Sequence, residues 1–157
     1  MLKLTGEYQH IVDDKGRVLV TNKLRSQIDV DIYGSSFFLV LGANGILCLY
    51  PERCFEELIH TFDDSITAPN EALDYERMSS ALACKVELDA QGRLLINERL
   101  KKRAKLKDHI TLVGVRDHIE LWNEQDWEQY LSDNMVQYQK QMQQARQLML
   151  QKNRDQV

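Results

Sequence analysis

The chain has 157 residues, of which 43% are hydrophobic and 28% are charged, and its formal net charge is −4. These values are typical of a globular protein with a buried core, and they argue against a protein that coats nucleic acid over its whole surface. They do not exclude binding through a local basic patch. The N-terminus is charged, no stretch approaches the roughly 20 apolar residues of a membrane span, and the three cysteines form no CxxC pair. We therefore expect a cytoplasmic protein with reduced thiols, no signal peptide and no membrane contact.

A short polar motif occurs twice in the chain, as D-D-K-G-R at 13–17 and as D-A-Q-G-R at 89–93. Alternating apolar residues precede each copy, and a short aliphatic run follows it. Glycine tolerates the positive φ of a tight turn, and aspartate can bond the backbone two residues further on. This pattern predicts a β-hairpin over about 6–20 and a second one around Gly92.

The rest of the first half predicts a short helix, a β-hairpin and a second helix. Thr21 or Asn22 would cap the first helix, and 33–36 is expected to be a loop. Strands are expected at 37–41 and 46–50, joined by an Asn-Gly turn. A helix is expected to open at Pro51-Glu52, because proline and acidic residues suit a helix N-terminus.

A polar stretch, 63–70, is the predicted linker, and a helix is expected over 71–83. The second half then repeats the order of the first, with Asn97 as a helix cap, a helix over 98–105, and strands at 110–115 and 119–122. Residues 13–24 correspond to 89–100 with a shift of 76, and residues 42–55 correspond to 114–127 with a shift of 72. This regularity indicates an internal duplication. The predicted domains are a first repeat at 1–70, a second at 71–135, and a tail at 136–157.

The Gln-rich tail predicts one continuous helix over 132–157, since it lacks Gly and Pro. Its apolar residues alternate at steps of four and three, which resembles a weak coiled-coil stripe. The stripe is formed by Leu131, Met135, Tyr138, Met142, Ala145 and Met149. Two interpretations stay open: the helix docks on its own domain, or it forms a contact between subunits.

The sequence resembles the MraZ family of bacterial transcriptional regulators, which are related to the AbrB-type (SpoVT-AbrB) swapped-hairpin DNA-binding proteins. The resemblance spans about 6–131 and is carried by both D-x-x-G-R turns together with Gly6-Glu7-Tyr8, Leu47–Pro51 and Glu120–Trp122. It implies an α+β fold of two pseudo-symmetric, tandem swapped-hairpin β-barrel repeats with short helices and a C-terminal helix. It also implies a homo-oligomeric ring that binds double-stranded DNA at direct repeats in the promoter of the division and cell-wall gene operon, as a nucleoid-associated repressor.

The sequence departs from the family pattern at two kinds of position. The family's Ile-Pro pair after each arginine-bearing strand is replaced by Val20-Thr21 and Ile96-Asn97, although Thr and Asn can cap a helix instead. The family's arginine after the short helix matches Arg25, but the second copy has Lys101. Lysine keeps the charge and lacks the planar fork that binds guanine or phosphate with two hydrogen bonds.

Basic residues in and after the two turns are the candidate DNA contacts. Arginine can pair with guanine O6 and N7, while lysine contacts phosphate. A competing interpretation is that Arg17 only bonds Asp13 across the turn, and that the basic run at 99–107 is a solvated helix face. The candidate set is Lys15, Arg17, Lys23, Arg25, Arg93, Arg99, Lys101 and Lys102.

No catalytic or metal-binding pattern is predicted. The four histidines show no ligand spacing with cysteine or acidic residues, no Gly-rich phosphate loop is present, and Cys48 and Cys54 are expected to be inert thiols. We therefore expect no enzyme activity, no cofactor and no metal. The favoured hypothesis is a DNA-binding repressor, and the alternative is an oligomeric scaffold that uses the same fold without specific DNA readout.

Overall fold

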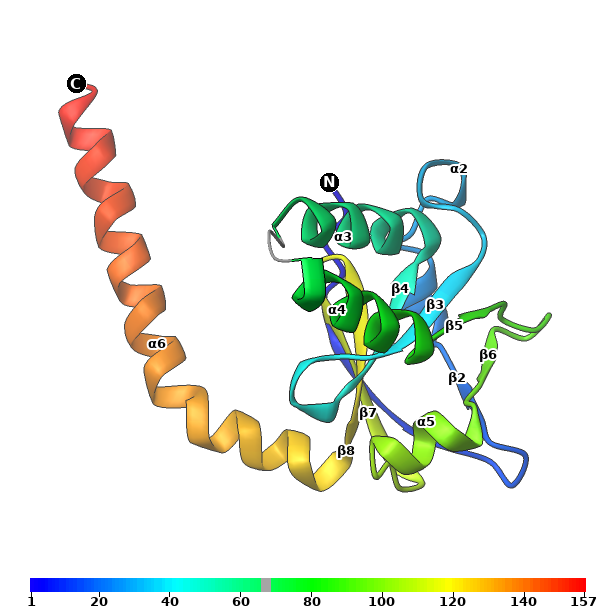
Figure 1. Cartoon of the computed structure of the whole chain (residues 1–157). Coiled ribbons are helices and arrows are strands. Elements are labelled where there is room, and N and C mark those ends of the chain that lie inside the picture. Colours follow the sequence, from blue (N-terminus) through cyan, green and yellow to red (C-terminus); the bar gives the residue numbers. More distant parts are fainter. Residues whose placement is uncertain (66–68) are drawn as a thin grey trace. The chain divides into compact units, whose positions relative to one another are not determined.

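The computed structural model describes residues 1–65 and 69–157, which divide into two compact units, Met1–Glu124 and Gln125–Val157. The first unit is α+β and contains the first predicted repeat and the second as far as Glu124 (Figure 1), while residues 125–135 of the second repeat belong to the second unit. The domain boundaries after residues 70 and 135 stay predictions. Within the described ranges, no helix combines the length and the apolarity that crossing a membrane requires.

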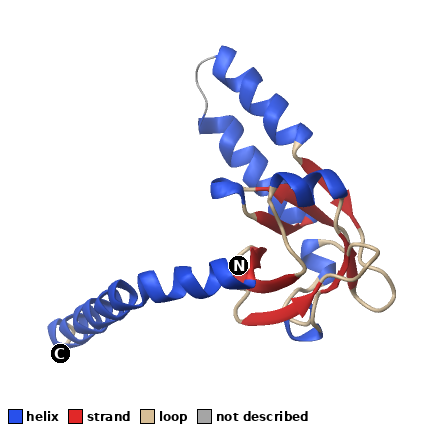
Figure 2. Ribbon diagram, turned by 90° about the horizontal axis from the view of Figure 1, so that it is seen from below, coloured by secondary structure: helices blue, strands red, loops and turns tan. Residues whose placement is uncertain are grey.

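Two antiparallel sheets form the first unit. The larger sheet has the strand order β1-β7-β8-β4-β3-β5, and the smaller one pairs β2 with β6. Both are visible in Figure 2, where the strands are red. The strands span Glu7–Ile11 (β1), Arg17–Leu19 (β2), Phe37–Leu41 (β3), Leu47–Pro51 (β4), Ala83–Val86 (β5), Arg93–Leu95 (β6), His109–Val115 (β7) and His118–Asn123 (β8).

The two repeats are interleaved, which corrects the predicted pairing of the D-x-x-G-R hairpins. The turns themselves are present, but β1 pairs with β7 and β2 pairs with β6, so each strand beside a turn finds its partner in the other repeat. In the same way β5 pairs with β3. The hairpins β3–β4 and β7–β8 are confirmed. The local pattern is compatible with either pairing, because it specifies a strand and a turn but not the strand's partner.

A pseudo-twofold axis relates the repeats and passes through the β4–β8 pair. Cys48 lies directly opposite Glu120 in this pair. These two residues also correspond to each other in the duplication, at the shift of 72. Cys48 and Glu120 therefore lie at the axis itself.

The buried core is shared by both repeats. Val18 and Leu94 from the small sheet, Leu24 and Leu100 from the short helices, and Leu49 with several strand residues are at most 3% exposed. They belong to one hydrophobic cluster. The predicted β-barrel repeats are not confirmed, because the six-stranded sheet is open, with β1 and β5 at its ends.

Short capped helices follow each arginine-bearing strand, as predicted. Thr21 caps α1 (Asn22–Arg25) and Asn97 caps α5 (Glu98–Arg103), each accepting a hydrogen bond from the backbone two residues on. The predicted helix over 98–105 ends earlier, since Lys105 has a left-handed φ of 52°. A further helix, α2 (Val30–Tyr33), was not predicted; Asp29 caps it.

Two longer helices lie side by side in the middle of the chain, α3 (Glu52–Ser65) and α4 (Pro69–Ala81) (Figures 1 and 2). The rings of Phe62 and Tyr75 meet at 5.3 Å between them. The predicted linker at 63–70 is wrong at both ends, where the chain is helical. Its middle, 66–68, lies outside the described residues.

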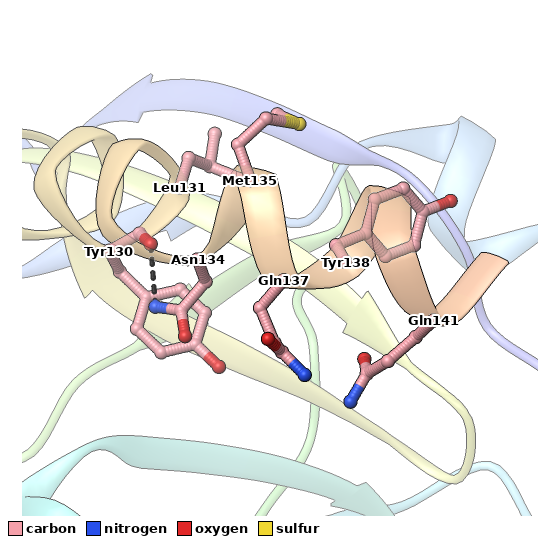
Figure 3. Close-up of a pocket in the computed structure, with 7 residues that line it drawn as sticks. All are labelled: Tyr130, Leu131, Asn134, Met135, Gln137, Tyr138 and Gln141. Carbon is pink, nitrogen blue, oxygen red and sulfur yellow. Dashed lines mark hydrogen bonds between the residues drawn. The ribbon is translucent and has the colours of Figure 1, made fainter. Parts of the chain in front are cut away.

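The second unit is a single helix, α6 (Glu124–Asp155), as the composition of the tail predicts. The helix bends along its length (Figure 1). Asn134 Nδ2 donates to the carbonyl of Tyr130 at 2.8 Å, and a side chain that competes for a helical carbonyl is a known cause of bending. An open hollow of about 490 Å³ lies along this stretch, lined by α6 residues from Tyr130 to Gln141 (Figure 3).

Candidate nucleic-acid interface

Aspartate organises the first D-x-x-G-R turn through several hydrogen bonds. Asp13 Oδ1 accepts from the backbone N–H of Lys15 and of Arg17, each at 2.9 Å, and Asp13 Oδ2 accepts from Arg17 Nε at 2.8 Å. The backbone closes the turn through Gly16, whose φ is 80°. One carboxylate thus fixes both the turn and the direction of the arginine side chain.

The second turn repeats this geometry. Asp89 Oδ1 accepts from the backbone of Gln91 and Arg93 at 3.0 and 2.9 Å, and Asp89 Oδ2 accepts from Arg93 Nε at 2.7 Å. Gly92 has the same φ of 80°. The turns are congruent because the motif Asp-x-x-Gly-Arg contains every group that makes these bonds.

The small sheet β2–β6 carries the two turns at its opposite ends (Figure 1). Beyond the paired strands, Val20 N–H donates to Gly92 O at 3.0 Å and Ile96 N–H donates to Gly16 O at 2.9 Å. Each turn is thereby bonded to the end of the other repeat's strand. We call this unit, residues 13–20 and 89–96, the twin-turn ribbon.

The outer face of the twin-turn ribbon combines two arginines with two leucines. Side chains alternate along a strand, so Val18 and Leu94 point into the core, while Arg17, Leu19, Arg93 and Leu95 share the other face. Leu19 and Leu95 are 39% and 59% exposed. Arg17 lies opposite Leu95, and Leu19 lies opposite Arg93. Strand spacings put the two arginine Cα atoms about 8 Å apart.

The ion pairs at the turns leave the two arginines unequally engaged. Hydrogen bonds to the carboxylate, foremost from the backbone N–H of Arg17, hold the pKa of Asp13 below its ordinary value, and Arg93 does the same for Asp89. The hydrogen bond between Arg17 and Asp13, which the competing interpretation expects, is present. It uses Nε, and within the described ranges the terminal nitrogens of Arg17 have no hydrogen bond, whereas Arg93 Nη2 also donates to Gln91 Oε1 at 3.2 Å.

Arg25 packs against the turn of the other repeat. Its Nε donates to Val20 O at 2.8 Å, and a Cβ added to Gly92 would lie 2.5 Å from the centre of the guanidinium group. Glycine at 92 thus lets the guanidinium group pack on the backbone of the turn, and the φ of 80° also favours glycine. Lys101, the counterpart of Arg25, instead pairs with Asp108 at 3.4 Å.

Helix α5 brings basic residues from the second repeat to the turn of the first. A Cβ added to Gly16 would lie 3.9 Å from Glu98 Oε1, so the start of α5 adjoins the first turn. Leu100 is buried, while Arg99, Lys102 and Arg103 are exposed and fall on one side of the helix. Lys15 is exposed in the adjoining turn. The first turn and α5 therefore form one cationic end of the ribbon.

The other end of the ribbon carries fewer basic residues. It combines the second turn, where Ala90 and Gln91 replace the Asp14-Lys15 pair, with α1, which contributes the exposed Lys23 and the packed Arg25. The structure thus brings the predicted residues together as two unequal groups. Lys101 lies apart from the exposed side of α5.

Several participating residues were not found from the sequence. Leu19 and Leu95 resemble ordinary core residues in the pattern, and only the pairing of β2 with β6 places them outward. A cluster of Cys48, His118 and Glu120 also brings three metal-ligand types together in the large sheet. The shift of 72 makes Cys48 and Glu120 corresponding residues, but only the pairing of β4 with β8 brings them together.

Comparison with known proteins identifies two copies of one family in the chain. The model of the family described as "MraZ protein, putative antitoxin-like" matches residues 4–76 and again 81–152. Proteins named "Transcriptional regulator MraZ" are similar over most of their length. That of Lachnoclostridium phytofermentans is 36% identical over 83% of this chain and 88% of its own. Those of Clostridium beijerinckii and Finegoldia magna are 35% and 32% identical, covering 83% and 85% of this chain and 88% and 90% of their own.

Proposed function

Because the chain belongs to the MraZ family, whose curated relatives are named transcriptional regulators, we propose that it represses transcription by binding promoter DNA through the twin-turn ribbon. The observation that carries this proposal is the pair of congruent turns, each holding an arginine by an aspartate, at the two ends of one ribbon. A two-stranded ribbon fits the major groove, which is about 12 Å wide.

The two ends of the ribbon would have different tasks. Asp13 holds Arg17 by Nε, so the terminal nitrogens remain for guanine O6 and N7. Lys15 and the exposed side of α5, with Arg99 and Lys102, would contact phosphates beside it. Arg93, Lys23, Arg25 and Lys101 complete the proposed set of contacts. We assign base readout chiefly to the first turn, because Gln91 occupies a terminal nitrogen of Arg93.

We further propose that the protein acts as a ring of subunits on direct repeats upstream of the division and cell-wall gene operon, in the nucleoid. A ring presents several ribbons to several repeats, and linked weak contacts sum to high affinity. This arrangement reconciles a net charge of −4 with DNA binding. Repression would be steric, since an oligomer on the promoter blocks polymerase.

A second candidate function, an oligomeric scaffold, is favoured by the exposed apolar side chains of α6. Met135, Tyr138, Met142 and Met149 are 42–62% exposed along the predicted stripe. Such a stripe suits contact with another helix. In this case the fold would assemble without reading DNA.

Titration against DNA separates the two candidates. The protein is added to promoter DNA that contains repeats and to a scrambled duplex of the same composition, at two salt concentrations. At both salt concentrations, we expect tighter binding to the duplex that contains the promoter repeats. Equal binding to the two duplexes, or no binding, would exclude the repressor proposal and favour the scaffold.

Two variants test the division of labour within the basic end. We expect Arg17→Ala to cost about 1–3 kcal/mol of specific binding and to relax sequence preference, because a base contact is lost. Lys102→Ala should weaken binding to both duplexes alike and reduce the salt slope by about 1. Arg77→Ala on α4, where Arg77 pairs with Asp74, is the matched control and should leave binding unchanged. Equal, sequence-independent losses for the first two variants would contradict the assignment.

A further inference from the structure

Three side chains with metal-ligand chemistry meet on one face of the central β4–β8 pair. Cys48 lies directly opposite Glu120, and His118 lies two residues before Glu120 on the same strand, so all three point to the same side. Cys48 is 5% exposed, and the side chains of His118 and Glu120 are 14% and 22% exposed. The cluster is thus largely shielded and has one edge open to solvent.

The donor atoms are close enough to share one cation. Cys48 Sγ, a ring nitrogen of His118 and a carboxylate oxygen of Glu120 lie within 4.8 Å of one another. His118 Nε2 and Glu120 Oε2 are 3.0 Å apart. Tetrahedral zinc holds nitrogen and oxygen ligands about 3.3 Å apart, and sulfur about 3.5 Å from each. Because the donor atoms lie within 4.8 Å of one another, reaching that geometry shortens the distances to the sulfur by at most about 1.3 Å.

Two of the three donors are held in place by a neighbouring group, and the third has room beside a glycine. Asp117 Oδ1 lies 2.9 Å from His118 Nδ1, which directs Nε2 toward the cluster. Trp122 Nε1 donates to Glu120 Oε1 at 3.0 Å, which leaves Oε2 facing the histidine. Gly42 leaves room for the thiol, since a Cβ there would lie 2.8 Å from Cys48 Sγ. Support of histidine and carboxylate ligands by outer groups is characteristic of metal sites in proteins.

Carboxylates place both ring nitrogens of His118. Asp117 Oδ1 lies 2.9 Å from Nδ1, and Glu120 Oε2 lies 3.0 Å from Nε2, so Nε2 is the nitrogen that faces the carboxylate of the cluster. A metal ion bound at Nε2 would replace the contact between Nε2 and Glu120, and both groups would become its ligands. The protons of the ligand groups are released to solvent when the metal binds.

We propose that Cys48, His118 and Glu120 bind a zinc-class divalent transition-metal ion, with the fourth position open to water. The donor set of thiolate, imidazole and carboxylate matches zinc and its spectroscopic substitute cobalt, and does not match calcium or magnesium. Because β4 and β8 come from different repeats, the ion joins the two halves of the chain at their axis. This proposal is independent of DNA binding.

Cobalt titration of the full, untagged, reduced chain tests the site. We expect one equivalent of Co²⁺ to bind and to produce the near-ultraviolet charge-transfer absorption of a thiolate–cobalt bond, which Zn²⁺ then abolishes. Cys48→Ser should remove this absorption. Cys84→Ser, which changes a half-buried thiol outside the cluster, is the matched control and should retain it. No charge-transfer absorption, its survival in Cys48→Ser, or its loss in Cys84→Ser would overturn the proposal.

A second variant and a second measurement keep the test decisive if Cys48→Ser does not fold. Glu120→Gln preserves the shape at a partly exposed position and removes a charged ligand. It should therefore weaken Co²⁺ binding by at least the roughly 10-fold that loss of an outer-shell group costs, while keeping the thiolate absorption. Saturating Zn²⁺ should raise the Tm of the wild-type chain by several degrees, and a chelator should reverse the shift. Unchanged affinity in Glu120→Gln, or an unchanged Tm, would also overturn the proposal.

Discussion

Arg25 joins the two repeats through a single side chain. It comes from the first repeat, bonds Val20 O within that repeat, and packs its guanidinium group on Gly92 of the second. At the opposite end of the ribbon, Gly16 has only ordinary neighbours, the nearest 3.5 Å from an added Cβ. The duplicated turns therefore have the same backbone and different surroundings.

This difference predicts unequal costs for one substitution at two equivalent glycines. Alanine at either position is strained at φ 80° by about 1–2 kcal/mol. Gly92→Ala should cost more than Gly16→Ala, because the new methyl displaces Arg25 and its hydrogen bond to Val20. Urea unfolding of both variants measures the difference.

The same pair in an Arg25→Ala background provides the control. Without the guanidinium group, the added methyl at 92 meets no such obstacle, so the costs of the two alanines should become similar. A difference that persists in this background would contradict the packing role of Arg25.

Residue-level features were predictable where the partners are near in sequence. The bond between Asp13 and Arg17 follows from a spacing of four residues around a glycine turn, as do the caps at Thr21 and Asn97. The packing of Arg25 on Gly92 and the meeting of Cys48 with His118 join residues about 70 positions apart. Such contacts depend on strand pairing, which local patterns do not specify.

The twin-turn ribbon consists of only three paired residues per strand, yet both of its faces are specialised. Its inner face adds Val18 and Leu94 to the core at 1% and 0% exposure, while its outer face exposes Leu19 and Leu95. Neighbouring leucines on one short strand thus have opposite environments.

This contrast predicts the stability of two adjacent substitutions. Leu94→Ala should destabilise the protein by about 2–5 kcal/mol, because it leaves a cavity beneath the ribbon. Leu95→Ala should change stability by no more than about 0.5 kcal/mol, since the side chain is 59% exposed. Thermal or urea unfolding measures both. Similar costs for the two variants would place the ribbon in a different register from the one described.

Elements were predictable in proportion to the strength of their local signals. The hairpins β3–β4 and β7–β8 and the helix α6 follow from strand alternation, turn residues and composition. Helix α2 was missed because its four residues are too few for a helical period, although Asp29 is a suitable cap. The polar stretch at 63–70 suggested a linker, but polar residues also occur at the ends of helices.

In the whole molecule, the strands of each repeat pair with strands of the other, so the first unit needs both repeats. Strands β1, β2 and β4 of the first repeat pair with β7, β6 and β8 of the second, and β3 pairs with β5. Of the strand pairs that the structure describes, a fragment of residues 1–82 keeps only β3–β4. The duplication was evident from the sequence, but the exchange and the open sheet were not, because periodicity carries no information on which copy supplies a partner.

Truncation tests this dependence. A fragment of residues 1–82 should not fold as a monomer and should either stay unfolded or associate with a second copy that supplies the missing strands. The matched control is residues 1–124, which retains every strand and should unfold cooperatively. Circular dichroism with analytical ultracentrifugation distinguishes these results. If the 1–82 fragment is monomeric and unfolds cooperatively, the pairing of strands between the repeats is not what stabilises the fold.

The position of Cys48 opposite Glu120 has a consequence for how such a protein can evolve. If two identical chains met at a true twofold axis, the residue opposite position 48 would be its own copy, so thiol would face thiol or carboxylate would face carboxylate. Fusion of the two copies into one gene removes this restriction, because each copy can then mutate separately. A duplicated chain can therefore place two different side chains opposite each other at the axis, where a homodimer always places two identical ones.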